Sequence, residues 1–153
     1  MNGAQAVDVG RWNRAEADMT EEAVAVGRIE HRPNVRVRAV SVDLFAGIPV
    51  SDFAAARPWY EQLFGGEPSF MPHETEAVWE LAEHRYVFIV EKAEGAGHAE
   101  HTIFLDDLDA RVAEISGRGL EPADRETYSN GVRKVIYRDA EGNEVSFGGA
   151  PAG

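Results

Sequence analysis

The sequence contains no cysteine among its 153 residues. This absence excludes disulfides, thiolate metal sites and cysteine nucleophiles. Basic residues are few as well, because 15 lysines and arginines stand against 27 aspartates and glutamates, which gives a formal net charge of −12. Nucleic acid binding needs clustered cations, so we expect no nucleic acid partner, and an anionic membrane surface would repel the chain.

Long apolar runs are also missing. No segment approaches the roughly 20 apolar residues that a membrane-spanning helix needs. The N-terminal residues contain no uninterrupted apolar stretch typical of a signal peptide, so we expect a cytoplasmic protein. Hydrophobic residues nevertheless make up 44% of the chain, which is enough for the packed core of one domain.

Residues 1–36 differ from the rest of the chain in composition and in hydrophobic pattern. They contain glycine, alanine, asparagine and acidic residues and show no sustained strand pattern. We expect a flexible N-terminal extension, with a short amphipathic helix as one option over residues 20–29. Residues 150–153 are expected to form a short tail.

The first structured unit begins at Val37. Aliphatic and β-branched residues over 40–50 predict a strand, and Ser51 or Asp52 can cap a helix over 53–64 that ends at two glycines. Three strand candidates follow, near residues 69–71, 77–81 and 86–91.

The same order then begins again. A strand over 101–105 leads to Asp107 as a cap and to a helix over 108–116, and strands follow near 120–127, 133–138 and 144–147. Residues 48–53 overlay residues 103–108 without a gap, with Asp52 on Asp107. This internal repeat predicts an α+β fold of two tandem βαβββ modules over about 37–97 and 98–149.

Three motifs resemble one known superfamily. They are Pro49-Val50-Ser51-Asp52-Phe53 with the helix that follows, Leu105-Asp106-Asp107-Leu108, and Asp139-Ala140-Glu141-Gly142-Asn143 with its closing strand. Together they are similar to the vicinal-oxygen-chelate superfamily of glyoxalases, bleomycin resistance proteins and extradiol dioxygenases. The resemblance implies a cupped mixed sheet with the helices outside. It is specific to a fold and not to a reaction, because the superfamily includes isomerases, dioxygenases and drug-binding proteins.

Catalytic members of this superfamily hold a divalent metal in the cup, with ligands from the first and last strands of each module. Carried over by position, those places fall on Phe45, Ile89, Glu100 and Ser146. Phe45 lies seven residues before Asp52, as Glu100 does before Asp107. Only Glu100 offers a hard oxygen ligand, and one carboxylate does not hold a catalytic ion. We therefore predict no metal site and no cofactor, although a non-standard divalent site stays open.

Glu100 has two interpretations. In an apolar cup it would lose hydration and could act as a general acid or base. It could equally be a wet carboxylate, or one paired with Arg133 or Lys134. His101 is expected to face the helices, and a shift of one residue in register would exchange it with Glu100 as a ligand or base.

The first functional hypothesis is therefore binding of a small organic molecule in an apolar cup without a catalytic metal. The resemblance and strand alternation predict that the cup is lined by Phe45, Gly47, Trp79, Ile89, Glu100, Tyr137 and Ser146. The alternative is an isomerase or lyase acting on a carbonyl metabolite, with Glu100 as acid or base; an interaction module is a third option. An exposed sheet edge favours a homodimer.

Overall fold

The computed structural model describes residues 41–153. The predicted extension over 1–36 and the helix considered over 20–29 lie outside the described residues. The elements of the first module are β1 (Leu44–Val50), α2 (Phe53–Phe64), β2 (Phe70–His73), β3 (Glu76–Ala82) and β4 (Arg85–Glu91). After the short 3₁₀ turn η1 (Ala93–Gly95), the second module comprises β5 (Glu100–Leu105), α3 (Leu108–Gly117), β6 (Asp124–Thr127), β7 (Arg133–Arg138) and β8 (Glu144–Gly149).

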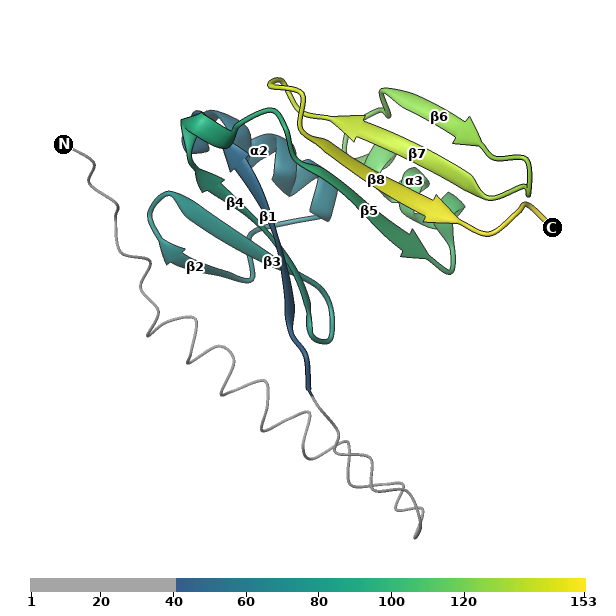
Figure 1. Ribbon diagram of the computed structural model, residues 1–153, viewed down its shortest axis with the longest axis horizontal. Helices are drawn as coiled ribbons and strands as arrows, with labels where there is room; N and C mark the ends of the chain where they lie inside the picture. Colours follow the sequence, from purple (N-terminus) through teal and green to yellow (C-terminus); the bar gives the residue numbers. More distant parts are fainter. Residues whose placement is uncertain (1–40) are drawn as a thin grey trace, which may run out of the picture.

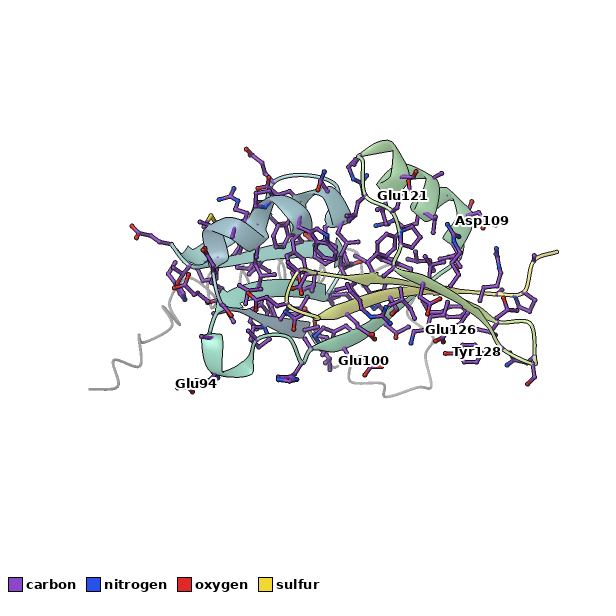
Figure 2. All side chains as sticks on the ribbon, turned by 90° about the horizontal axis from the view of Figure 1, so that it is seen from above. Glu94, Glu100, Asp109, Glu121, Glu126 and Tyr128 are labelled. Carbon is purple, nitrogen blue, oxygen red and sulfur yellow. The ribbon has the colours of Figure 1, made fainter. Side chains whose placement is uncertain are left out.

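The two modules repeat one topology. The strand orders are β1-β4-β3-β2 and β5-β8-β7-β6, and in each module the first and last strands pair in parallel. Figure 1 shows the modules side by side, and Figure 2 shows both helices on the same side of the sheets. The prediction of two βαβββ modules in an α+β fold is confirmed.

Both helices begin where the sequence predicts. Asp52 Oδ1 accepts a hydrogen bond from Ala55 N at 3.1 Å, and Asp107 Oδ1 accepts one from Ala110 N at 3.0 Å. Each side chain thereby pairs one of the amides that the first helical turn leaves without a backbone acceptor. At the far end of α2, Gly65 takes a left-handed conformation with φ of 96°, which ends the helix.

Each module forms a sheet of its own, and no backbone ladder joins β1 to β5. Side chains of the second module instead pair the free edge of β1. His101 Nε2 donates to Gly47 O at 2.8 Å, Asn143 Nδ2 donates to Pro49 O at 2.9 Å, and Glu141 Oε1 accepts from Ser51 N at 2.9 Å. These backbone groups belong to alternate residues, as expected for the groups that point out of one strand edge.

The two modules also share one hydrophobic core. Buried side chains from both sheets and both helices form a single cluster that includes Ile48, Leu63, Val87, Ile115 and Phe147. Packing between the helix-side faces of the sheets therefore adds to the hydrogen bonds at the β1 edge.

Asn143 lies at the centre of the junction and has no exposed surface. Its Oδ1 accepts from Ala99 N at 3.0 Å, and its Nδ2 also donates to Asp139 Oδ2 at 2.8 Å. The same Asp139 oxygen accepts from Tyr60 Oη at 2.7 Å. Burial, and next the hydrogen bond to Asp139, raise the pKa of Tyr60, so its hydroxyl keeps its proton as a donor. The network joins α2, the strand edges and the β7–β8 turn.

We expect Asn143→Ala to lower the free energy of unfolding by about 3 kcal/mol, because it leaves several buried backbone and carboxylate groups without partners. Urea denaturation followed by circular dichroism measures the change. Asn130→Ala is the matched control, because Asn130 is exposed and its Oδ1 accepts only from Val132 N at 3.1 Å. Equal losses in both variants would contradict a junction held by Asn143.

Candidate functional site

Each sheet has one face toward the helices and one outer face. Ile48 and Val50 of β1 lie in the core, so alternation places Phe45 and Gly47 on the outer face. Figure 2 shows Glu100 pointing away from the helices, on the same side as Glu126 and Tyr128. Ser146 is on this face too, because it pairs with Thr102, two residues from Glu100. Four of the seven predicted pocket residues therefore share the outer face.

The other three predicted pocket residues lie elsewhere. Trp79, Ile89 and Tyr137 belong to the buried core on the helix side, with exposed fractions of 4%, 0% and 0%. Trp79 Nε1 donates to Gly66 O at 2.9 Å, whereas Tyr137 Oη has no hydrogen-bond partner among the described residues. Burial raises the pKa of Tyr137 and keeps it neutral.

The position of Ile89 is a correction to the register expected for β4. Gly47 pairs with Phe88 in the first module as Thr102 pairs with Ser146 in the second. Phe88 is therefore the structural counterpart of Ser146, and Ile89 pairs with Ile48 on the opposite face. Residues 86–90 are all apolar or aromatic, so the sequence of β4 offers no alternation from which to read its register.

An aromatic ring lies over a glycine of the neighbouring strand in both modules. A Cβ on Gly47 would lie 2.5 Å from Cζ of Phe88, and a Cβ on Gly148 would lie 3.1 Å from Cδ2 of Phe104. Only glycine gives the Phe88 ring this space above β1. Beside this pair, the rings of Phe45 and Tyr86 stack with centroids 4.4 Å apart. The outer face of the first module is thus packed with aromatic rings.

The donor set at the superfamily's metal positions does not fit a divalent ion. With the register corrected, these positions carry Phe45, Phe88, Glu100 and Ser146, and neither phenylalanine can ligate. Ser146 is buried and its hydroxyl has no partner among residues 41–153. Within the same residues, no group of three histidines, aspartates or glutamates is close enough to hold a metal.

Glu100 and His101 occupy opposite faces of β5, as alternation predicts. Glu100 is exposed, and its carboxylate forms no hydrogen bond or ion pair with a described residue. Arg133, considered above as its partner, instead forms an ion pair with Asp109 at 2.8 Å. His101 is half-buried and is fixed by its hydrogen bond to Gly47 O. The chain alone does not provide the burial that an acid–base role for Glu100 requires.

A cleft of about 620 Å³ opens between the modules along β5. Residues from β1, the end of β3, β4, β5, β8 and α3 contribute to it. Its apolar lining includes Leu44, Ala46, Val87, Ile103 and Leu105. Charged side chains join this lining at a few points, chiefly Arg85, Glu100, Asp106 and Arg111. A cavity of this size and composition is typical of a site for a small organic molecule.

Of the predicted pocket residues, only Glu100 lines this cleft. Sequence reasoning missed Leu44, Ala46 and Arg111. Strand alternation assigns Leu44 and Ala46 to the helix side, which normally means the core, and the helical pattern gives Arg111 no special place. Nothing local in the sequence reports how the two modules are set against each other, and that arrangement creates the cleft.

None of the helices among residues 41–153 is long and apolar enough to span a bilayer. No protein-family profile matches the chain. No curated protein matches it either.

Solved structures do match. A glyoxalase/bleomycin resistance protein from Catenulispora acidiphila DSM 44928 is 56% identical, covers 72% of this chain and 100% of its own, and superimposes with a TM-score of 0.69. An antibiotic-binding protein from Streptomyces sp. CB03234 is 21% identical over 76% of this chain and 100% of its own, with a TM-score of 0.55.

A bleomycin-binding protein in complex with bleomycin is 15% identical over 70% of this chain and 97% of its own, with a TM-score of 0.56. The last two likenesses concern the fold alone. The first, at 56% identity over the whole of the related chain, is close enough to fix the family. This chain therefore belongs to the glyoxalase/bleomycin resistance protein family, as its repeat, its capping aspartates and its paired βαβββ modules indicate.

Proposed function

We propose that this protein binds a small organic molecule of largely apolar character in the cleft between its modules, without a catalytic metal. The observation that carries the proposal is the cleft itself, whose volume of about 620 Å³ and apolar lining suit a ligand of drug size. The antibiotic- and bleomycin-binding proteins of the same fold add support by analogy.

The residues at the metal positions support binding over metal-assisted chemistry. Two of the four are phenylalanines packed against neighbouring residues, and the only carboxylate, Glu100, is exposed. No observation in the described residues favours an isomerase or lyase that uses Glu100 as acid or base.

Filling the cleft should weaken binding. Ala46→Trp places an indole in the cleft, and we expect it to weaken binding of the fluorescent neutral probe N-phenyl-1-naphthylamine by at least about tenfold. Fluorescence titration measures the affinity. Ala54→Trp on the exposed side of α2 adds the same ring away from the cleft and should bind as the unsubstituted protein does.

Circular dichroism shows whether Ala46→Trp is folded. If it is not, Leu44→Gln replaces it, because Leu44 is 62% exposed and its loss should cost affinity but little stability. Unchanged affinity in the folded variant would refute the cleft as the site.

Metal content tests the second part of the proposal. We expect freshly purified protein to hold well below one equivalent of any divalent metal by elemental analysis, and added Zn²⁺, Ni²⁺ or Mn²⁺ to leave probe affinity unchanged. Glu100→Gln should change neither result. A stoichiometric metal that is lost in Glu100→Gln would restore the metal-dependent alternative.

We also propose that the protein pairs with a second copy through the outer face of the second module. Phe104 on β5 is 63% exposed, and strand alternation places it on the outer face with Glu100. Tyr128, which lies on the same side as Glu100 in Figure 2, is 47% exposed. Large apolar side chains exposed together are typical of contact surfaces. Sedimentation velocity should show a dimer that Phe104→Glu converts to a monomer, while Ala54→Glu on α2 leaves the dimer intact. A monomer in the unsubstituted protein would contradict this pairing.

A further inference from the structure

Arg111 is the cation that is placed to pair with an anionic group of a molecule in the cleft. It lies one turn into α3, and its guanidinium carbon is 6.0 Å from the centroid of the Phe147 ring. Its side chain is 31% exposed, so it is partly shielded from water. The Phe147 ring contacts one face of the guanidinium, so the N–H groups at the edges of the guanidinium plane stay available.

The charge of Arg111 is only weakly paired. Its nearest carboxylate oxygen, Glu114 Oε2, is 3.7 Å from Nε, which is longer than a hydrogen bond, and Glu114 is 61% exposed. By contrast, Arg133 and Arg138 hold carboxylates at 2.8 and 2.7 Å. Among described residues, the backbone N–H of Arg111 donates to Asp107 O, but its guanidinium donates no hydrogen bond. A half-buried guanidinium of this kind keeps its N–H donors available to bind a planar anionic group.

The other charged groups of the cleft do not compete for this role. Glu100 and Asp106 are exposed and are therefore well hydrated. Arg85 is exposed as well, and its Nη1 donates to Glu83 O at 3.3 Å. Hydrated charges at the mouth of a cleft contribute less to affinity than a partly desolvated one within it.

We propose that the ligand of the cleft carries an acidic group, a carboxylate or an equivalent planar or tetrahedral oxyanion, on an apolar ring system, and that Arg111 pairs with it. This inference rests on the proposed function of the cleft. The net charge of −12 does not oppose it at close range, because salt screens charges beyond about 8 Å at physiological ionic strength.

Two fluorescent probes with the same aromatic body test the inference. 8-Anilinonaphthalene-1-sulfonate carries an anionic group that N-phenyl-1-naphthylamine lacks. We expect Arg111→Gln to weaken binding of the sulfonate by at least about tenfold, as the loss of a charge-assisted hydrogen bond implies, and binding of the neutral probe by less than about twofold. Lys92→Gln removes the same charge from an exposed position outside the cleft and should change neither affinity.

A second variant keeps the test decisive if Arg111→Gln does not fold. Glu114→Gln removes the weak competitor of Arg111 from an exposed site and should strengthen sulfonate binding about two- to threefold, with no effect on the neutral probe. Equal responses of the two probes in the folded variants would overturn the role of Arg111 while leaving the cleft as a binding site. Failure of the unsubstituted protein to bind either probe would instead refute the proposed function.

Discussion

The free edge of β1 is the constraint on which the arrangement of this molecule depends. An unpaired strand edge presents backbone groups that must find partners. In this chain side chains of the second module supply them, at Gly47, Pro49 and Ser51. Asn143 is the most important of these side chains, because it is fully buried and also accepts a hydrogen bond from Ala99 N at the start of the second module. The two modules are thereby set in one relative orientation.

The same constraint explains where the cleft lies. All three contacts fall in the second half of β1 or just after it, whereas Leu44 and Ala46 in the first half line the cleft. The modules are tied at one end of β1 and separate toward the other. His101 marks the boundary, because its imidazole binds Gly47 O and the same residue lines the cleft. A cavity of this origin is a property of the pair of modules and of neither module by itself.

Because the cleft arises from the arrangement of the two modules, only part of the structure could be predicted from the sequence. Asp52 and Asp107 cap their helices through local bonds, so the repeat and the helix starts were readable from the sequence. The register of β4 was not, since its uniformly apolar residues fit either face. The cleft could not be predicted from the sequence for a different reason. Its lining depends on hydrogen bonds between residues 54 or more positions apart, such as Gly47 and His101, which no local pattern encodes.

The groups around the cleft agree with the proposed binding function. Proton transfer needs a side chain that changes its charge near neutral pH. His101 is engaged with Gly47 O through Nε2, and the exposed carboxylate of Glu100 has no partner among residues 41–153 to orient it. An arginine guanidinium is a donor without an acceptor atom, so Arg111 can attract an anion but cannot act as a base. With phenylalanines at two metal positions, these residues support the proposed binding function better than metal-assisted chemistry.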